Sequence, residues 1–352
     1  MKRSTLLVIL FALSAVLFAA HSAAAAKPPV KVFILAGQSN MVGPGVVDFS
    51  ESRTKGYLQR GLTEEQIAKK RSGALEYLVK DPTRTERYQH LIDTNGDWVV
   101  RDDVWICYNR KDGMRKGGLT VGFGARDDKI GPELQFGHRM GDALDEQVLL
   151  IKTAWGGKSL AVDFRSPSMG KIDFPMHPNL EAKVKEDPEL VGRYYRLMLE
   201  EVKSVLDNLG DHFPDYEGQG YKIVGFCWHQ GWNDGCDEQC SITYASNILK
   251  FIPDVRRDFG VADLPVVIAG SGFGGMQPRG GVVGRLQKYV QPAQAAAAEK
   301  LERVRYIDTR EFYRPEDISP GRGDIEHWYS NAESYFLIGD SLGREMTGLL
   351  AK

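Results

Sequence analysis

The chain has 352 residues, of which 42% are hydrophobic and 10% aromatic, and this is the composition of a globular protein with a sizeable core. A formal net charge of −2 and a pI near 6.4 give no electrostatic reason to expect nucleic acid or an anionic membrane as a partner.

The N-terminal segment has the pattern of a secretory signal peptide. Met1-Lys2-Arg3 supplies a short positive start, residues 6–20 are almost wholly apolar, and the alanines at 24–26 offer a small-residue cleavage site. A retained membrane anchor is the alternative, but the apolar run is short for a span. We therefore expect residues 1–26 to be removed and the mature chain, 27–352, to be exported to a periplasm or outside the cell, without stable membrane association.

The mature chain alternates short apolar runs with longer segments of helical period. This pattern is typical of a parallel sheet with helices on both faces. It predicts one α/β domain with a five-stranded, mainly parallel, doubly wound sheet of flavodoxin-like type. The predicted strands are 30–36, 147–153, 221–228, 264–269 and 304–308, and the predicted helices are 132–144, 192–206, 243–259, 283–301 and 330–349.

Residues 46–129 depart from this alternation and are predicted to form an elaborated insert between the first two strands. The insert is rich in charge, with a helix predicted over 63–79 and irregular chain over 102–128. Long ordered insertions of this kind are often functional. Within the insert, 93–97 begins like a calcium loop, but Trp98 and Val104 stand where glycine and glutamate are needed, so a polar turn is favoured.

Polar residues follow the first predicted strand where its buried run ends, in Gly37-Gln38-Ser39-Asn40. Ligands of open parallel sheets bind beyond the carboxyl ends of the strands, so Ser39 lies where a reactive group is expected. The same tetrapeptide is also ordinary turn and capping chemistry, and alone it does not establish a nucleophile.

Three later segments lie where they can converge on Ser39. Residues 153–157 end the second strand, 228–234 end the third, and Asp324-Ile325-Glu326-His327 precede the last helix. A serine becomes a nucleophile when a base takes its proton and a third group orients that base, and the D-x-x-H spacing suits this arrangement. Backbone N–H groups and an amide side chain could bind the oxyanion that develops during acyl transfer.

The ordered set of motifs resembles the SGNH-hydrolase superfamily, and more closely the group that joins carbohydrate esterase family 6 with the sialate O-acetylesterase-like proteins. The resemblance implies a three-layer α/β/α fold and a serine esterase that removes O-acetyl groups from carbohydrates, with no metal or organic cofactor. It extends from residue 32 to nearly the C-terminus and is weakest over the insert. It rests on G-Q-S-N-M at 37–41, G-P-E-L at 131–134, W-G-G at 155–157, W-H-Q-G at 228–231 and D-x-x-H at 324–327.

This resemblance assigns a role to each residue of the site. Ser39 is the nucleophile, His327 the general base and then acid, and Asp324 the group that orients the histidine. The oxyanion is expected to be bound by the N–H groups of Ser39, Gly156 and Gly157.

The third segment departs from the family pattern. Relatives have Q-G-E-x-D where this chain has Gln230-Gly231-Trp232-Asn233-Asp234. Gln230 is the side-chain oxyanion donor that the carbohydrate-esterase pattern suggests, whereas G-x-N-D of the wider superfamily nominates Asn233. We favour Gln230, because W-H-Q-G is the better-matched frame. Trp232 is a candidate stacking surface for a sugar ring, with plain packing as the alternative.

Four further residues adjoin the predicted site. Gln38 and His229 are candidate substrate contacts, and for His229 a supporting hydrogen bond is favoured over catalysis. Glu133 either holds the loops of the site by accepting backbone hydrogen bonds or stabilises its own helix N-terminus. His138 is expected to be a buried structural histidine.

Four cysteines in an exported chain can pair in three ways. Cys236 and Cys240 lie close together in a loop-like segment and are predicted to form a disulfide, whereas Cys107 and Cys227 lie in apolar surroundings and are expected to be buried thiols. A zinc site is disfavoured, because no paired C-x-x-C spacing is present.

The leading hypothesis is therefore an exported O-acetylesterase whose substrate is an acetylated saccharide, as in a sialate O-acetylesterase or an acetylxylan esterase. A general short-chain carboxylester hydrolase is one alternative. A carbohydrate-binding protein that kept the fold and lost turnover is another, although the intact Ser39, Asp324 and His327 argue against it. The identity of the acetylated sugar stays open at this point.

Overall fold

The structure is a computed structural model that describes residues 27–173 and 178–351. The predicted signal peptide, residues 1–26, lies outside the described residues. Among the helices in these two ranges, none combines the length and the hydropathy that crossing a bilayer would require.

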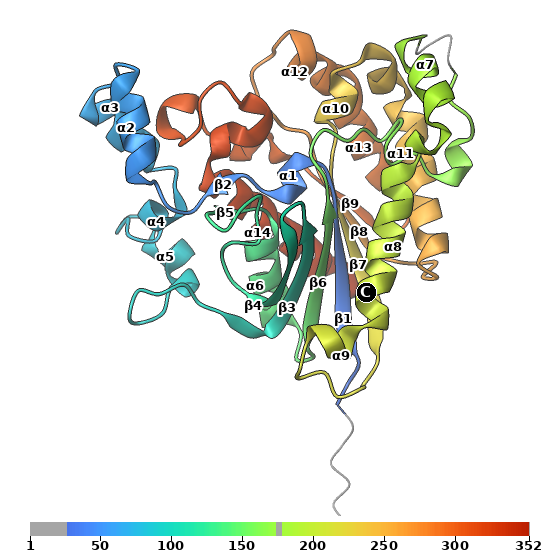
Figure 1. Cartoon of the computed structure of the whole chain (residues 1–352), viewed down its shortest axis with the longest axis horizontal. Coiled ribbons are helices and arrows are strands. Elements are labelled where there is room, and N and C mark those ends of the chain that lie inside the picture. Colours follow the sequence, from blue (N-terminus) through green and yellow to red (C-terminus); the bar gives the residue numbers. More distant parts are fainter. Residues whose placement is uncertain (1–26, 174–177, 352) are drawn as a thin grey trace, which may run out of the picture.

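The described chain forms a central sheet of seven strands in the order β4-β3-β6-β1-β7-β8-β9 (Figure 1). All five predicted strands belong to it and pair in parallel. At the carboxyl end of β1, Gly37 pairs with Ala154 on one side and His229 on the other. The bounds of these strands are β1 (Val30–Gly37), β6 (Val148–Ala154), β7 (Tyr221–His229), β8 (Val266–Ala269) and β9 (Val304–Ile307).

Two strands of the insert extend this sheet, so the prediction of irregular chain over 102–128 is wrong. β3 (Arg101–Arg110) pairs in parallel with β6, and β4 (Gly113–Leu119) returns antiparallel to β3 as the edge strand. Most of β4 is exposed, and it is rich in glycine and basic residues, so it lacks the apolar alternation that marks a strand in sequence. β2 (Gly45–Val46) and β5 (Lys129–Ile130) form a separate small sheet.

Helices cover both faces of the central sheet, as the three-layer prediction requires (Figure 1). One face carries α6 (Glu133–Ala143) and α14 (Ala332–Leu350), and the other carries α8 (Arg193–Asp207), α11 (Glu238–Asp258) and α13 (Gln291–Lys300). Phe33 of β1 packs edge-on against Phe136 of α6, with ring centroids 5.4 Å apart. On the other face, Phe226 of β7 contacts Phe251 of α11 at 6.1 Å.

Two predicted helices are interrupted, each for a local reason. The helix predicted over 63–79 is divided at Gly73, where a Cβ atom would lie 2.5 Å from the Asn331 side chain and 2.6 Å from the carbonyl oxygen of Ile318. The helix predicted over 283–301 contains a π-helical turn, Leu286–Val290, just before Pro292, which cannot donate a backbone hydrogen bond.

The remaining helices are short. They are α1 (Ser39–Val42), α2 (Glu51–Gln59), α3 (Glu64–Arg71), α4 (Leu75–Leu78), α5 (Thr85–Tyr88), α7 (Pro178–Glu186), α9 (Leu209–His212), α10 (Trp232–Gly235) and α12 (Gly281–Arg285). Short 3-10 helices lie at Gln89–Leu91, Pro167–Met169, Pro188–Leu190, Thr309–Phe312, Glu316–Ile318 and Ile325–Ser330.

The insert docks onto the chain that leads to the predicted catalytic histidine. The ammonium group of Lys70 in α3 donates hydrogen bonds of 2.6–3.2 Å to three carbonyl oxygens, those of Glu316, Ser319 and Gly321. The hydroxyl of Tyr57 in α2 donates to the carbonyl oxygen of Pro320 at 2.5 Å. The insert therefore supports the segment that carries His327, a role that its sequence does not reveal.

Candidate active site

The end of β1 turns sharply because of a glycine. Gly37 has a φ of +150°, and a Cβ atom there would lie 2.2 Å from the carbonyl oxygen of His229. Any other residue would push β1 and β7 apart at this point. The close approach places Ser39 at the start of α1, beyond the carboxyl edge of the sheet.

Gln38 ties the first strand to the loop after β7. Its side-chain oxygen accepts hydrogen bonds from the backbone N–H groups of Gly231 at 3.1 Å and Asn233 at 3.2 Å. The side chain is only 2% exposed, and its carbonyl oxygen positions the loop beside Ser39. A contact between Gln38 and substrate stays a prediction.

The structure brings Ser39 and His327 together. The Ser39 Oγ and the His327 Nε2 are 3.1 Å apart, within hydrogen-bond distance. Ser39 remains partly exposed, so a substrate can reach its hydroxyl. This pair has the geometry of a nucleophile and its general base.

Asn40 and Tyr335 hold the two halves of this pair in place. The Asn40 amide donates to the carbonyl oxygen of Glu326 at 2.8 Å and accepts from the Tyr335 hydroxyl at 2.6 Å. The same hydroxyl lies 3.1 Å from the carbonyl oxygen of His327. Sequence analysis missed both residues. Asn40 could have been suspected from its place in the G-Q-S-N motif, but nothing around Tyr335 distinguishes it from other helical tyrosines.

Asp324 lies in the same turn as His327 but does not reach its ring. The backbone N–H of His327 donates to the Asp324 carbonyl oxygen at 2.9 Å, and one carboxylate oxygen accepts from the Ser330 hydroxyl at 3.3 Å. The other carboxylate oxygen is buried with no hydrogen-bond partner among the described residues. Burial raises the pKa of Asp324, and the charge of His327 opposes this rise.

The backbone after His327 is strained. Trp328, Tyr329 and Ser330 have φ values of 52°, 50° and 56°, a left-handed conformation that costs a non-glycine residue about 1–2 kcal/mol. Such strain persists only where the surroundings enforce it, and it is concentrated at functional sites. Here the Tyr329 carbonyl accepts from the Gly321 N–H at 2.6 Å, and Trp328 is fully buried against Phe273.

The glycine pair after β6 lies beside the nucleophile. A Cβ atom on Gly156 would be 3.9 Å from the Cβ of Ser39, so the two residues are neighbours without a clash. The N–H groups of Gly156 and Gly157 donate to no acceptor among the described residues, and both glycines are exposed. They are therefore available to a developing oxyanion.

The two amides named as oxyanion donors have different surroundings. Gln230 is 1% exposed, and its amide nitrogen donates to the Lys158 carbonyl oxygen at 3.0 Å and to Asp234 at 2.5 Å. Its side-chain oxygen accepts from the Tyr244 hydroxyl at 3.1 Å. Asn233 is partly exposed, and its side chain has no hydrogen-bond partner among the described residues.

Asp234 joins this buried network to the loop that follows the glycine pair. Its carboxylate accepts from the backbone N–H groups of Leu160 at 2.8 Å and Ala161 at 2.9 Å. Burial raises the pKa of Asp234 to about 7, although its hydrogen bonds favour the charged form. Gln230 and Asp234 thus organise residues 158–161 rather than face the substrate.

His229 differs from what was predicted for a substrate contact, whereas stacking of a sugar ring on Trp232 stays a prediction. His229 is 1% exposed, and burial lowers the pKa of its ring to about 3, so the ring stays neutral and out of reach of substrate. Neither ring nitrogen has a hydrogen-bond partner among the described residues, so the favoured supporting hydrogen bond is absent as well. Trp232 is partly exposed and packs edge-on against Phe273 at 5.2 Å.

A buried ion pair lies behind α1. The Lys152 ammonium is 2.8 Å from Glu133, and it donates to the carbonyl oxygens of Val42 at 2.8 Å and Phe123 at 2.7 Å. Glu133 also accepts from the Gly131 N–H at 2.7 Å, so one of its oxygens contacts the chain just before its own helix and the other contacts Lys152. Sequence analysis missed Lys152, because a single lysine in an otherwise apolar strand gives no sign of a buried partner. His138 is buried, as expected.

The predicted disulfide is not formed. All four cysteines are free: Cys107 and Cys227 are buried as expected, Cys240 is buried, and Cys236 is exposed. The segment is helical rather than loop-like, because Asp237 caps α11 by accepting from the Cys240 N–H at 2.9 Å. This cap starts α11 five residues earlier than predicted and directs the two thiols into different environments.

Solved structures with a similar fold include that of a protein from Arabidopsis thaliana. It has a TM-score of 0.52 and 17% identity, and the match covers 92% of this chain and 99% of that chain. A carbohydrate acetylesterase from Xanthomonas citri has a TM-score of 0.46 and 12% identity, with 89% and 57% covered. NanS has a TM-score of 0.47 and 11% identity, with 93% and 99% covered. Among curated protein sequences, none matches this chain.

A family model matches residues 29–347, which is most of the chain. Its description is "Carbohydrate esterase, sialic acid-specific acetylesterase". The match includes the turn that carries Ser39, the glycine pair and the segment that carries His327. The chain therefore belongs to the sialic acid-specific acetylesterase family of carbohydrate esterases.

Proposed function

We propose that this carbohydrate esterase removes O-acetyl groups from a saccharide through an acetyl-enzyme intermediate on Ser39. The observation that carries the proposal is the 3.1 Å contact between the Ser39 Oγ and the His327 Nε2, at the carboxyl edge of the sheet. Beside it lie the N–H groups of Gly156 and Gly157, which donate to no acceptor within 27–173 and 178–351. A paired nucleophile and base next to free donors is the minimum that acyl transfer requires.

In the first half-reaction His327 acts as a general base. Its Nε2 takes the proton of the Ser39 hydroxyl while the oxygen attacks the acetyl carbonyl carbon. The carbonyl oxygen becomes an oxyanion, which the N–H groups of Ser39, Gly156 and Gly157 stabilise together with the Asn233 amide. The tetrahedral intermediate collapses when His327 returns the proton to the departing sugar oxygen, and Ser39 is left acetylated.

In the second half-reaction His327 acts on water. Its neutral ring takes a proton from a water molecule, and the resulting attack on the acetyl-serine carbonyl forms the same oxyanion. Collapse breaks the bond between the acetyl carbon and the Ser39 Oγ, His327 returns its proton to this oxygen, and the acetyl group leaves as acetate. Asp324 assists both halves by its charge, because a nearby carboxylate stabilises the imidazolium that forms each time.

Asn233 is proposed as the side-chain oxyanion donor in preference to Gln230. Both N–H positions of the Gln230 amide are already used inside the protein, by the Lys158 carbonyl oxygen and Asp234. Asn233 has its backbone held by Gln38 and its side chain unengaged, which is the condition of a preorganised donor.

We infer from the pattern of residues 1–26 that the enzyme works after export, with Lys27 as the mature N-terminus. Mass spectrometry of protein recovered outside the cytoplasm should give the mass of residues 27–352. The mass of the full 352-residue chain in that fraction would contradict cleavage.

The test of the acyl-enzyme route is direct detection of acetylated Ser39. Mature enzyme mixed with excess p-nitrophenyl acetate and quenched in acid should gain the mass of one acetyl group, and peptide mapping should place it on the fragment that contains Ser39. Ser39→Ala should gain nothing. An acetyl group on any other residue, or hydrolysis that is unchanged in Ser39→Ala, would refute the route.

A further inference from the structure

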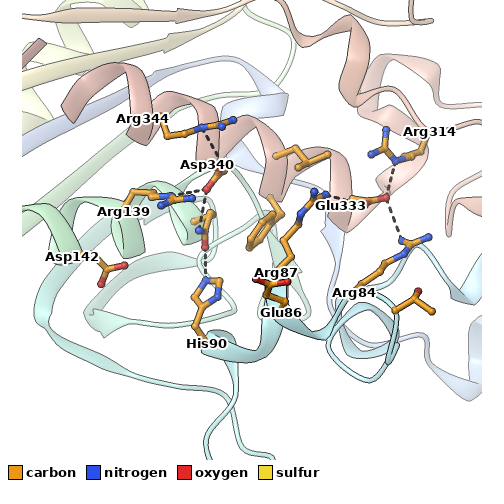
Figure 2. Close-up of a pocket in the computed structure, with 14 residues that line it drawn as sticks. Arg84, Glu86, Arg87, His90, Arg139, Asp142, Arg314, Glu333, Asp340 and Arg344 are labelled. Atoms are coloured by element: carbon orange, nitrogen blue, oxygen red, sulfur yellow. Dashed lines mark hydrogen bonds and ion pairs between the residues drawn. The ribbon is translucent and has the colours of Figure 1, made fainter. Parts of the chain in front are cut away.

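A cavity of about 820 Å³ lies between α6, α14 and the insert segment around α5 (Figure 2). This volume is within the range of small-molecule sites. Neither Ser39 nor His327 lines the cavity. The cavity therefore needs an explanation separate from the esterase site.

The geometry of α14 separates the two sites. Tyr335 faces the catalytic segment, because its hydroxyl contacts Asn40. At about 100° per residue, Glu333, Asp340 and Arg344 point roughly to the opposite side of the helix, and these residues line the cavity. One helix thus serves the nucleophile on one face and this cavity on the other.

The first of two arginine clusters surrounds Glu333. Arg314 is 2.7 Å from this carboxylate, Arg84 is 3.4 Å away and Arg87 is 4.0 Å away. Burial alone would raise the pKa of Glu333, but the hydrogen bond and charge of Arg314, the charge of Arg84 and the hydrogen bond from Tyr88 together lower it. One ionised carboxylate therefore lies within 4.0 Å of three guanidinium groups.

The second cluster surrounds Asp340, one arginine from each helix. Arg139 of α6 is 2.7 Å from this carboxylate and Arg344 of α14 is 3.2 Å away (Figure 2). The two terminal nitrogens of Arg139 donate to no acceptor among the described residues. His90 extends the cluster through Gln135, whose amide bridges His90 at 2.8 Å and Asp340 at 3.3 Å.

The two clusters carry an excess of positive charge, because five arginines contact three carboxylates: Glu333, Asp340 and Asp81, the last of which lies 3.3 Å from Arg84. Two further carboxylates, Glu86 and Asp142, line the cavity, and Asp142 is already paired at 2.7 Å with Arg101, which lies outside the lining. Guanidinium groups with unused donors favour planar oxyanions such as carboxylates, which they bind through two parallel hydrogen bonds.

The spacing of the clusters suggests the shape of the ligand. Glu333 and Asp340 are seven residues apart on α14, which is about 10 Å along the helix. Phe336 and Leu337 line the cavity between them. A ligand that fits has anionic groups about 10 Å apart and a ring face with little polarity in the middle.

We propose that this cavity binds an acidic oligosaccharide, with carboxylates of separate sugar residues on the two arginine clusters and a sugar ring over Phe336 and Leu337. The proposal goes beyond the esterase reaction and does not depend on it. A lipid does not suit a cavity lined mainly by charged groups, and a lone phosphate would occupy only one cluster.

The test is a binding measurement on mature Ser39→Ala protein, in which turnover is slower by roughly 10³-fold or more, so that loss of esterase function cannot be confused with loss of this site. Calorimetric titrations compare trigalacturonate, a neutral galactose trisaccharide and inorganic phosphate. The expected result is one bound trigalacturonate, at least about 10-fold tighter than either comparison ligand and weakened by added salt, because ion pairs near the surface are screened.

Two sets of variants locate the binding. Arg139→Gln/Arg344→Gln removes charge from one cluster and Arg87→Gln from the other, and each should weaken trigalacturonate binding about 10-fold or more. These side chains are 44%, 61% and 57% exposed, so the fold should survive, which thermal unfolding checks. The control is Arg126→Gln/Arg193→Gln, two ion-paired arginines elsewhere on the surface.

The proposal is overturned if trigalacturonate does not bind, if the neutral sugar or phosphate binds as tightly, or if the cluster variants bind it like the control. Tight phosphate binding that both sets of cluster variants abolish would identify a simple anion site, and the oligosaccharide assignment would then be wrong.

Discussion

Asn233 and Gln230 show how two amides of the same loop acquire different roles. Gln230 has its donors and acceptor engaged within the buried network of Asp234 and Tyr244. The backbone N–H of Asn233 is held by Gln38, and the Asn233 side chain has no hydrogen-bond partner among the described residues. An oxyanion donor must be fixed in direction but unoccupied, so the loop assigns the structural role to one amide and the catalytic role to the other.

Asn233→Ala should lower kcat by about 10²- to 10³-fold with little change in KM, because an oxyanion donor acts mainly in the transition state. The alanine keeps the backbone N–H that bonds to Gln38, so the loop should stay in place. Steady-state kinetics on p-nitrophenyl acetate would measure the effect, and a loss below about 5-fold would remove Asn233 from the mechanism.

Gln230→Met is the matched comparison for Asn233→Ala. It keeps the length of the side chain but leaves buried donors and acceptors without partners, at a cost of about 1–3 kcal/mol each. We expect a lower midpoint in urea unfolding and a smaller loss of kcat than in Asn233→Ala. The reverse ranking of kcat would restore Gln230 as the oxyanion donor.

At the residue scale, the sequence predicted the groups that react better than the groups that support them. Ser39 and His327 stand in recognisable motifs, and the structure places them within hydrogen-bond distance. The burial of Gln38 and His229 depends on how the loops after β6 and β7 close over them, and no local pattern encodes that closure. Lys152 shows the same limit, because its partner Glu133 lies in another element.

At the scale of elements, α1 is held from behind by the ion pair between Glu133 and Lys152. Lys152 donates to the carbonyl oxygen of Val42, the last residue of α1, and Glu133 holds the N–H of Gly131. Both side chains are almost completely buried. The pair therefore links β6 and α6 to the short helix that begins with Ser39.

Lys152→Met should lower the free energy of unfolding by about 3–5 kcal/mol, because it leaves the Glu133 carboxylate buried without its partner. The double variant Glu133→Gln/Lys152→Met removes that buried charge and should recover part of this stability. Its kcat should nevertheless stay about 10-fold or more below the wild-type value, since α1 has lost its anchor. A double variant with wild-type kcat would show that the pair contributes stability alone.

Element boundaries were predictable where packing and periodicity agree. The five parallel strands were predicted to within two residues at each end, because each is a short buried apolar run between turns. β4 was missed because an exposed edge strand has no core face to impose a pattern, whereas β3 contains a buried apolar run, Val104–Tyr108, of the kind that predicted the other strands. The division between α3 and α4 was missed, because Gly73 is required by the close approach of Asn331, a residue far away in sequence.

At the scale of the whole molecule, the insert and the C-terminal segment support each other around the site. Lys70 and Tyr57 hold the carbonyl groups of residues 316–321, and the chain then enters the strained turn that follows His327. The strain is thus maintained by contacts between regions more than 200 residues apart. Such contacts cannot be predicted from composition or from the periodicity of the sequence.

Buried His229 should contribute to the pH dependence of global stability, beside His138, which acts in the same direction, and Asp234, which acts in the opposite one. Burial lowers the pKa of His229 to about 3, from an ordinary value of 6.5, so the unfolded chain binds this proton more readily than the native protein. The stability that the neutral ring contributes is fully present above pH 6.5 and is lost as pH falls toward 3. At pH 5 the loss should be about 2 kcal/mol.

His229→Asn should make the slope of unfolding free energy against pH more negative than in wild type between pH 5 and 7, because it removes a group whose contribution to stability rises with pH, whatever its effect on absolute stability. Urea unfolding at several pH values gives the slope for wild type and variant. Parallel curves for wild type and His229→Asn would contradict the proposed burial of a neutral ring.

The most direct measurement for the central claim is acetate release by the mature protein from an O-acetylated sialic acid and from acetylated xylan, with Ser39→Ala alongside. The proposed mechanism predicts that wild type releases acetate from at least one saccharide and that the variant is slower by roughly 10³-fold or more. Release that is equal in both proteins, or no release from any acetylated saccharide, would contradict it.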